Sequence, residues 1–358
     1  MSTLLVMAGG TGGHVFPALA VAENLRNRGV EVVWLGTRSG LEARTIPAAG
    51  FEIEWINIRG VRGKGVLGWL RMPFLVLAAV TQAIAVVKRR RPGALLGMGG
   101  FVAGPGGIAA WLLRQPLLIH EANALAGLTN QLLVRIATRV MTGFPGTFGK
   151  STRQEYVGNP VRPEISDLPP PRARLSERSG PLRVLVVGGS QGARALNLQL
   201  PEIVQHLSAH KCAFNIWHQT GKHQRDEVER RYRDLGVHAT VNAFIDEIAR
   251  AYEWADLVLC RAGAMTVAEV STAGVVAVFV PFPHAVGDHQ TANANYLAEH
   301  GAAHLVPEHQ LGESLPSILS QYCSHRDQLI PIAEKARRLG KPNATQVVAD
   351  ICMETLDA

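Results

Sequence analysis

Two glycine-rich turns contain the residue types that could hold a phosphorylated ligand. Leu4–Ala8 runs into the turn Gly9–His14, and Val184–Val187 runs into the turn Gly188–Ala193. Because glycine has no Cβ, the backbone of such a turn can approach a ligand closely, and the N–H groups at the start of the next helix are free to bind an anion. The sequence therefore predicts two phosphorylated ligands held face to face in one chain.

A third glycine cluster extends from Gly97 to Gly107 in the same setting, after an apolar strand and before a helix that Pro105 is suited to open. With two such turns, the first half of the chain favours a large anionic ligand over a small neutral one, and the alternative role of the third cluster is to let a helix pack closely on the sheet. NAD is disfavoured. Val15 stands where a dinucleotide fingerprint needs Gly or Ala, and Thr37 and Arg38 stand where it needs an acidic residue.

The elements that must position these turns alternate between short apolar strands and helical stretches, which predicts α/β architecture with parallel sheets. Ligands of open parallel sheets bind outside the carboxyl ends of the strands, so the chemistry is expected in the cleft between two such domains. The proline-rich stretch 163–181 is interpreted as an interdomain linker. Strands are predicted at Leu4–Ala8, Glu31–Gly36, Ala94–Gly97, Leu117–His120, Arg139–Thr142, Arg183–Val187, Phe214–His218, Thr240–Ala243, Leu257–Cys260 and Val276–Val280.

Composition places the chain among folded soluble proteins. Its 358 residues suit two domains of conventional size, with 47% hydrophobic and 18% charged residues. The four cysteines are dispersed and form no CxxC pair, which indicates reduced thiols in a cytoplasmic protein. The N-terminus lacks the basic and apolar regions of a signal peptide.

The net charge of +7 is concentrated in the first half of the chain. Residues 1–163 contain 18 Lys and Arg against seven Glu and no Asp, whereas the remainder contains 18 against 22 acidic residues. An anionic surface is therefore expected to meet the first half. Nucleic acid is not an expected partner, because the basic residues are not interleaved with stacking aromatics.

Basic residues between Arg59 and Arg91 flank an apolar segment that contains Trp69, Leu70, Phe74 and Leu75. This pattern is typical of contact with an anionic membrane surface and equally of a buried helix with a solvated basic end. The longest apolar run, Met72–Val80, is interpreted as too short for a transmembrane helix, which needs about 20 residues.

Six motifs occur in order along nearly the whole chain: Gly9–Pro17, Gly99–Gly107, His120–Asn123, Gly158–Arg162, Gly188–Ala193 and Arg261–Glu269. Their order resembles the MurG family of bacterial glycosyltransferases. The resemblance implies the GT-B fold, two Rossmann-like parallel-sheet domains facing a central cleft. Residues 1–163 would be the acceptor- and membrane-binding domain, 164–340 the UDP-GlcNAc-binding domain, and 341–358 a helix that returns to the N-terminal domain.

The family moves N-acetylglucosamine from UDP-GlcNAc to the C4 hydroxyl of the muramyl sugar of lipid I, with inversion, giving lipid II and UDP in peptidoglycan synthesis. Lipid I is a muramyl pentapeptide linked to a polyprenyl diphosphate. The resemblance implies the same reaction here, with peripheral attachment to the cytoplasmic face of the cell membrane. The implied partners are UDP-GlcNAc, lipid I, the anionic membrane surface and other cell-wall synthesis proteins.

No cofactor is implied. The chain contains no DxD motif, so we expect metal-independent transfer in which helix dipoles and Arg162 stabilise the departing UDP. The acceptor hydroxyl must lose its proton to a general base. His14 is the leading candidate because imidazole titrates near neutral pH, and its alternative role is a hydrogen bond to the acceptor diphosphate. Glu121 is the second candidate, and Asn123 would position the donor sugar or the nucleophile.

The resemblance also assigns binding residues. The donor diphosphate falls on Ser190 and Gln191, the ribose hydroxyls on Glu269, the sugar hydroxyls on Gln290, and uracil on backbone groups at Ile245. The other implied donor-binding residues are Thr11, Gly12, Gly13, Asn123, Arg162, Ala264, Met265, Thr266, Val267 and Ala268. The acceptor diphosphate is implied at Gly13, His14, Gly99, Gly100 and Gly104, and the membrane contact at Trp69, Leu70, Phe74 and Leu75.

Other function classes remain open from sequence. A GT-B glycosyltransferase acting on another lipid or a natural-product acceptor would differ in the first half, whose motifs argue against it. An NADP-dependent oxidoreductase using Arg38 would ignore UDP-sugars. A non-catalytic nucleotide-sugar binder would need neither His14 nor Glu121. His284, Asp288 and His289 form a weaker alternative as a metal site.

Overall fold

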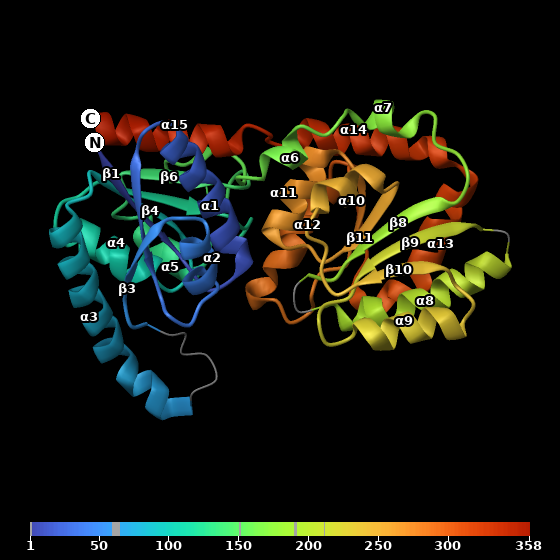
Figure 1. Ribbon diagram of the computed structural model, residues 1–358, viewed down its shortest axis with the longest axis horizontal. Coiled ribbons are helices and arrows are strands. Elements are labelled where there is room, and N and C mark those ends of the chain that lie inside the picture. The colour runs from blue at the N-terminus through green and yellow to red at the C-terminus, as the bar shows by residue number, and fades with distance from the viewer. Residues whose placement is uncertain (1, 59–64, 150–151, 190–191, 211) are drawn as a thin grey trace. The chain divides into compact units, whose positions relative to one another are not determined.

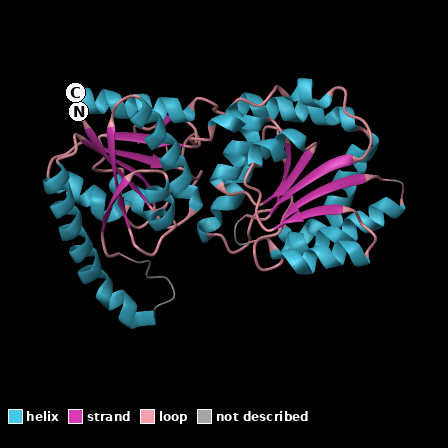
Figure 2. Ribbon diagram, in the orientation of Figure 1, coloured by secondary structure: helices cyan, strands magenta, loops and turns pink. Residues whose placement is uncertain are grey.

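The chain divides into two α/β units, each built around one parallel sheet (Figure 1). Unit 1 consists of Met1–Arg162 and Pro342–Ala358, and unit 2 of Pro163–Lys341. The protein is described by a computed structural model over residues 2–58, 65–149, 152–189, 192–210 and 212–358, without the side chains of 65–71 and 286. Figure 2 shows helices on both faces of each sheet, the arrangement of a doubly wound fold.

The sheet of unit 1 has the strand order β3-β2-β1-β4-β5-β6-β7, and all neighbouring strands are parallel. The order reverses between β1 and β4, because the chain moves outward through β2 and β3 before it returns to the other side of β1. The strands are β1 (Thr3–Ala8), β2 (Glu31–Gly36), β3 (Glu52–Trp55), β4 (Ala94–Gly99), β5 (Leu117–Glu121), β6 (Arg139–Thr142) and β7 (Glu155–Tyr156).

Strand β1 is buried on both faces, as its unbroken apolar sequence predicts for a central parallel strand. Leu4 and Val6 pack into a core with α1 and α15, whereas Leu5 and Met7 pack into a second core with α3 and α4. The helices of this unit are α1 (Gly12–Asn27), α2 (Glu42–Ala48), α3 (Gly65–Arg90), α4 (Ala103–Leu112), α5 (Leu128–Leu133) and α15 (Ala344–Asp357).

Unit 2 repeats this plan with the strand order β10-β9-β8-β11-β12-β13, again parallel throughout. Val184 and Val186 of β8 pack with residues of α8, α9 and α13 into one core. The strands are β8 (Leu182–Val187), β9 (Phe214–Gln219), β10 (Ala239–Asn242), β11 (Leu257–Cys260), β12 (Val276–Phe279) and β13 (His304–Leu305). The longer helices are α8 (Arg194–Ala209), α9 (Arg225–Asp234), α10 (Ile248–Trp254), α11 (Ala264–Ala273), α12 (His289–Ala298), α13 (Leu311–Ser324) and α14 (Leu329–Leu339).

All ten predicted strands form, which confirms the predicted α/β class. Three further strands were not predicted. Two of them, β7 and β13, have only two residues each. The third, β3, has the sequence EIEW and lies at the edge of the sheet, so charged residues interrupt its apolar pattern. The four cysteines are free, with Cys260 and Cys352 buried.

The interpretation of 163–181 as a linker is wrong. This segment belongs to unit 2 and contains two short helices, α6 (Pro163–Ser166) and α7 (Pro171–Leu175). Arg174 fixes it by donating hydrogen bonds to the carbonyl oxygens of Pro169, Tyr252, Ala273 and Gly274. The prolines therefore begin short helices here, a position in which their missing N–H costs nothing, rather than marking a flexible connection.

The C-terminal helix α15 lies against α1 in unit 1. Its residues Val348 and Ile351 join the core formed by β1 and α1. Two ion pairs tie its polar side to the same unit: Arg28 binds Asp350, and Arg139 lies 3.3 Å from Glu354. The last helix in the sequence thus completes the first unit.

Candidate functional site

The glycine turns lie at the carboxyl ends of the strands where the order reverses in each sheet. In unit 1 the turn Gly9–His14 follows β1, and Gly99 ends β4, the neighbouring strand. In unit 2 the turn Gly188–Ala193 follows β8, and Arg261–Gly263 follows the neighbouring strand β11. In open parallel sheets the crevice at this place is where ligands bind. Each unit therefore has one candidate site, at the turns selected from sequence.

In unit 1 the first turn leads directly into α1. Thr11 is the N-cap residue and makes no side-chain capping hydrogen bond, so the N–H groups of Gly12 and Gly13 point out of the helix without a side-chain acceptor. This end of the helix has the partial positive charge that favours an anion. It is the geometry expected of a phosphate-binding turn.

The third glycine cluster packs directly on the first turn. A Cβ at Gly100 would lie 2.2 Å from the Gly9 carbonyl oxygen, and a Cβ at Gly99 would lie 2.3 Å from Nδ1 of His14. Both glycines also have positive φ, +84° and +104°. Any side chain at these positions would therefore push the two turns apart, whereas Gly104 lies in the first turn of α4.

His14 lies at the junction of these two turns, with its Nδ1 atom buried and without a hydrogen-bond partner among the described residues. Burial lowers the pKa of His14 below its usual value, while the charge of Glu121 and a hydrogen bond with the Met98 backbone act in the opposite direction. The ring is therefore neutral at neutral pH, and a neutral imidazole can accept a proton.

Glu121, the last residue of β5, is surrounded by hydrogen-bond donors. Its Oε1 accepts from the Asn123 N–H at 2.9 Å and the Asn123 side-chain amide at 3.2 Å. Its Oε2 accepts from the Gly127 N–H at 3.0 Å and the Asn130 side-chain amide at 2.9 Å. Both oxygens are thus committed to shaping the 122–130 loop, and Asn123 is held in place by this carboxylate.

The end of β5 is also tied to the segment that precedes Arg162. His120 Nε2 lies 2.9 Å from the Gly158 carbonyl oxygen, and the Asn159 amide donates to the Ala122 carbonyl oxygen at 2.9 Å. Burial lowers the pKa of His120, so this ring is neutral and donates from Nε2. Arg162 is exposed at the end of this segment, as the last residue of unit 1 before the chain enters unit 2.

In unit 2 the second turn rests on a buried polar network. A Cβ at Gly192 would lie 2.4 Å from the Thr220 carbonyl oxygen, which also accepts from the Asn197 side-chain amide at 3.0 Å. Asn197 Oδ1 accepts from His218 Nε2 at 3.0 Å, and His218 Nδ1 accepts from the Tyr232 hydroxyl at 3.0 Å. Burial lowers the pKa of His218 to about 3, so its ring is neutral and makes both bonds. Ser190 and Gln191 lie outside the described residues, and α8 begins after them at Arg194.

The predicted donor residues Ala264–Glu269 form the first turns of α11. Gly263 is the N-cap residue and supplies no side chain, so this helix N-terminus is also open to an anion. Ala264 and Val267 are buried in the core, whereas Met265, Thr266 and Ala268 are half-buried. Glu269 accepts a hydrogen bond from the Tyr252 hydroxyl at 3.0 Å.

Two further predicted residues already have internal partners. The Ile245 N–H donates to Gln219 Oε1 at 2.9 Å, so only its carbonyl group remains for a base. Gln290 Oε1 accepts from the Phe282 N–H at 2.9 Å, which turns the amide NH2 group away from that backbone. Asn293 donates to the Ala262 carbonyl oxygen at 3.2 Å beside the start of α11.

Known proteins match the chain over almost its whole length. Residues 4–142 match the glycosyltransferase family 28 N-terminal domain, and residues 183–348 match the glycosyltransferase family 28 C-terminal domain. The crystal structure of MurG from Acinetobacter baumannii is 43% identical and superimposes with a TM-score of 0.84, covering 99% of this chain and 100% of that one. The chain belongs to the MurG family of glycosyltransferases.

Two curated relatives have the name UDP-N-acetylglucosamine--N-acetylmuramyl-(pentapeptide) pyrophosphoryl-undecaprenol N-acetylglucosamine transferase. The protein from Nitrosococcus oceani is 53% identical over 352 residues, 98% of each chain. The protein from Aeromonas hydrophila is 52% identical over 98% of this chain and 96% of its own. The fold class predicted from sequence, GT-B with two Rossmann-like parallel-sheet domains, is confirmed for this MurG-family chain.

The predicted membrane segment of this MurG-family protein is divided between core and surface. Ala79, Ala83, Val86 and Val87, in the second half of α3, are buried in the core with β1 and α4. Phe74 and Leu77, in the first half, are 74% and 62% exposed, and Leu75 is also exposed. Figure 1 shows this first half extending beyond the sheet. The side chains of Trp69 and Leu70 lie outside the described residues.

The length argument against a transmembrane helix is wrong. Helix α3 continues past Val80 through the uncharged Thr81 and Gln82, so Met72–Arg90 is long and apolar enough to cross a bilayer by length and composition. Only 28% of this stretch is buried. However, its second half packs on the sheet, and its basic end is ion-paired: Arg89 and Arg90 lie 2.5 and 2.7 Å from Glu54 of β3. A helix committed to a folded core in this way is not surrounded by lipid.

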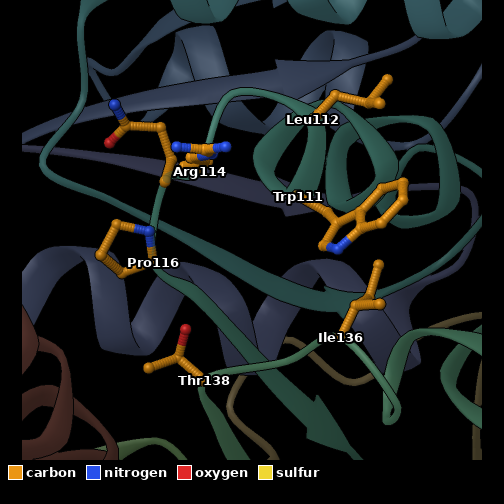
Figure 3. Close-up of a pocket in the computed structure, with 7 residues that line it drawn as sticks. Trp111, Leu112, Arg114, Pro116, Ile136 and Thr138 are labelled. Atoms are coloured by element: carbon orange, nitrogen blue, oxygen red, sulfur yellow. The ribbon is translucent and has the colours of Figure 1, made fainter.

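Unit 1 also has a shallow pocket of about 540 Å³. It lies at the amino ends of the strands, whereas the glycine turns lie at their carboxyl ends. Trp111 and Leu112, at the end of α4, line it with Ile136 and Thr138, which precede β6 (Figure 3). Both Trp111 and Leu112 are more than half exposed. Because this pocket lies at the amino ends of the strands, it is separate from the candidate site of the MurG-family chain.

Sequence reasoning missed several residues that shape the two sites, and four of them hydrogen-bond directly to predicted site residues or to the first glycine turn. Tyr252 and Gln219 contact predicted donor residues, Asn130 contacts Glu121, and Glu42 lies beneath the first glycine turn. None of the four belongs to a recognisable motif, and each lies far along the chain from its partner or in an unremarkable helix. Only their burial and hydrogen bonds identify them.

Proposed function

We propose that the protein transfers N-acetylglucosamine from UDP-GlcNAc to the C4 hydroxyl of the muramyl sugar of lipid I, giving lipid II and UDP. The 53% identity to a curated transferase of this name over 98% of both chains supports this function. Two helix N-termini without a side-chain cap, that of α1 in unit 1 and that of α11 in unit 2, suit a reaction between two diphosphate-bearing substrates. Peptidoglycan synthesis is then the process that the protein serves.

The donor is assigned to unit 2. The open N-terminus of α11 and the second glycine turn supply N–H groups for the diphosphate of UDP, and Glu269 supplies a carboxylate for the ribose hydroxyls. The Tyr252 hydroxyl orients this carboxylate. Gln290 presents its NH2 group to the sugar, and Ile245 offers its carbonyl oxygen to the N–H of uracil.

The acceptor is assigned to unit 1. Its diphosphate would bind the N–H groups of Gly12 and Gly13, beside Gly99, Gly100 and Gly104. Of the two candidate bases, His14 is favoured, because its ring is neutral whereas both oxygens of Glu121 already accept two hydrogen bonds each. Proton transfer from the C4 hydroxyl to His14 would accompany attack on the anomeric carbon from the side opposite UDP, which inverts its configuration.

The departing UDP carries negative charge that must be stabilised. Helix N-termini and the exposed Arg162 are proposed to do this without a metal ion, in keeping with the lack of a DxD motif in the sequence. We further propose peripheral attachment to the cytoplasmic face of the membrane through the exposed apolar residues Phe74, Leu75 and Leu77 of α3.

The experiment that tests this function is UDP release from UDP-GlcNAc by the purified protein in EDTA, with and without a short-chain analogue of lipid I. Release that needs the analogue and survives EDTA is the expected result. Release in EDTA with a different lipid acceptor but not with this analogue would contradict the proposed acceptor. Loss of release in EDTA, restored by a divalent cation, would contradict the metal-independent mechanism.

A further inference from the structure

Glu42 is a fully buried carboxylate that the proposed reaction does not use. It is the first residue of α2, it has no solvent exposure, and it lies at the same edge of the sheet as the first glycine turn. All the donors to its side chain among the described residues are neutral groups. Burying a carboxylate without a cation is costly, so its retention needs a structural or functional reason.

The carboxylate joins the first glycine turn to the end of β2. Its Oε2 accepts a hydrogen bond from the Gly10 N–H at 2.8 Å. Its Oε1 accepts from both the N–H and the hydroxyl of Thr37, at 3.0 and 2.8 Å. Thr37 directly follows β2, so a rigid strand end fixes the carboxylate, and the carboxylate in turn fixes Gly10.

Three glycines leave room for this side chain. A Cβ at Gly9 would lie 2.7 Å from Glu42 Oε1, one at Gly40 would lie 2.0 Å from Oε2, and one at Gly36 would lie 2.9 Å from Cγ. The glycines around the turn therefore serve the internal carboxylate as well as the approach of a ligand. Packing and hydrogen bonding independently place Glu42 beneath the turn.

The direction of the Gly10 N–H separates two kinds of amide in the turn. Gly10, with φ of +92°, points its N–H inward to Glu42. The N–H groups of Gly12 and Gly13, at the uncapped start of α1, are the ones directed to a ligand. The same turn also supports the third glycine cluster, because Gly100 packs on the carbonyl oxygen of Gly9.

The position of Glu42 differs from that of the acidic residue in a dinucleotide-binding domain. In a dinucleotide-binding domain an acidic residue at the end of the second strand binds a ribose. Here a carboxylate does reach the end of β2, but it comes from α2 and both its oxygens are taken by protein donors. It is buried and unavailable to a ribose.

We propose that Glu42 is a positioning residue for the acceptor diphosphate, and that it acts by holding Gly9 and Gly10 so that Gly12 and Gly13 present their N–H groups to that ligand. This inference rests on the proposed assignment of the acceptor to unit 1. Three donors converge on the side chain, and only a group that accepts without donating satisfies all of them. Glutamine has the same shape, but its NH2 group would face either the Gly10 N–H or the Thr37 pair.

The test compares Glu42→Gln with Glu23→Gln in the full-length protein. Glu23 is exposed on α1, so its substitution removes the same charge from the same unit without touching the turn. Inorganic pyrophosphate is the probe, and the amide NMR signals of Gly10, Gly12 and Gly13 report its binding. We expect Glu42→Gln to weaken pyrophosphate binding at Gly12 and Gly13 about 10-fold, the effect of leaving one buried donor unpaired. Hydrogen exchange at Gly10 should become faster in the same variant.

UDP binding separates this role from a general loss of structure. UDP affinity should stay within about twofold of wild type, because unit 2 does not contain the substitution. With a lipid I analogue, the KM for the acceptor should rise while the KM for UDP-GlcNAc does not. If Glu42→Gln reduces the folded population, Thr37→Val is the second variant. It removes one donor to Oε1 and should produce a smaller change in the same direction.

The possible outcomes separate the positioning role of Glu42 from the acceptor assignment on which it rests. If pyrophosphate shifts Gly12 and Gly13 in wild type and equally in Glu42→Gln, with unchanged exchange at Gly10, Glu42 has no positioning role. If wild type itself shows no response at Gly12 and Gly13, the acceptor assignment is wrong and the inference that depends on it is overturned too. Weaker binding in Glu42→Gln alone, with wild-type affinity in Glu23→Gln, supports the proposal.

Discussion

At the scale of single residues, the proposed acceptor site contains two titratable side chains with different surroundings. His14 has a neutral ring with an unpartnered Nδ1, whereas the Glu121 carboxylate is saturated by four hydrogen bonds. A general base needs a free lone pair to accept a proton. A carboxylate that holds a loop in place instead has its lone pairs occupied by hydrogen bonds. The sequence suggested both residues as candidates for the base, and their hydrogen bonds are what separate them.

His14→Ala should reduce turnover by about 10² to 10⁴, the usual contribution of a general base. UDP-GlcNAc affinity should stay near that of wild type, because the donor is assigned to the other unit. Single-turnover rates with a lipid I analogue, together with a UDP-GlcNAc titration, check this. His206→Ala, an exposed histidine of α8, is the matched control. Wild-type turnover in His14→Ala would remove this residue from the mechanism.

Glu121→Gln should shift the acid limb of the pH–rate profile to lower pH. The charge of Glu121 raises the pKa of His14, so its removal lowers that pKa further and keeps the ring neutral to a lower pH. Turnover at the plateau should also fall, because an NH2 group would face donors in the 122–130 loop. A full kcat profile between about pH 5 and 8 measures both effects. An acid limb that moves upward would contradict the electrostatic coupling.

Tyr252→Phe should raise the KM for UDP-GlcNAc about fivefold, since the lost hydrogen bond to Glu269 is worth about 1 kcal/mol. The acceptor KM should not change. Tyr322→Phe is the control, because the hydroxyl of this buried tyrosine is hydrogen-bonded to His304, which is not one of the predicted donor residues. Equal donor KM values in the two variants would show that Tyr252 does not orient the carboxylate that we assign to the ribose.

At the scale of elements, each glycine turn rests on buried polar groups that hold its backbone. Glu42 and Thr37 lie beneath the first turn, and Asn197 and His218 lie beneath the second. Turns that bind anions need several N–H groups aimed in one direction, and glycine alone cannot fix such a direction. The buried polar groups hold the turn backbone in one conformation, which glycine residues alone would not do.

Helix α3 has a second half that is buried in the core and a first half with exposed apolar side chains, to which we assign the membrane contact. Replacing both Phe74 and Leu77 with Ser should weaken binding to anionic vesicles about 10-fold or more, because each exposed side chain contributes about 1 to 2 kcal/mol when it enters the membrane interface. Vesicle sedimentation measures this, with turnover on a soluble analogue as the check on folding. Val347→Ser, at an exposed site on α15, is the control. Equal sedimentation of the two variants would contradict the membrane role of α3.

Patterns that repeat locally could be predicted from the sequence, and contacts between distant segments could not. Strands such as β1 and β8 are continuous apolar runs followed by glycine, so they and their turns were visible. The edge strand β3 and the packing of 163–181 depend on neighbours distant in sequence, such as Arg90 for β3 and Ala273 for Arg174. The buried carboxylate of Glu42 was hidden for the same reason.

At the scale of the whole molecule, one substrate is assigned to each unit, but the chain does not complete the units in order. Ile351→Ala in α15 should lower the free energy of unfolding of unit 1 by ~2 to 5 kcal/mol, the cost of a cavity in a close-packed core. Val347→Ala on the exposed side of the same helix should cost far less. Thermal unfolding followed with and without UDP separates the two units, since UDP should protect unit 2 in both variants. A similar destabilisation by both substitutions would contradict the packing of α15.

The return of α15 to unit 1 has a consequence for how the protein is made. Unit 2 is one continuous stretch and emerges from the ribosome whole, whereas the core of unit 1 lacks Val348 and Ile351 until all of unit 2 has been synthesised. A nascent or prematurely terminated chain would therefore have a complete unit 2 and a unit 1 with an open apolar face. Such fragments are natural targets for chaperones and proteases. Unit 1 can therefore finish folding only after unit 2 has been synthesised.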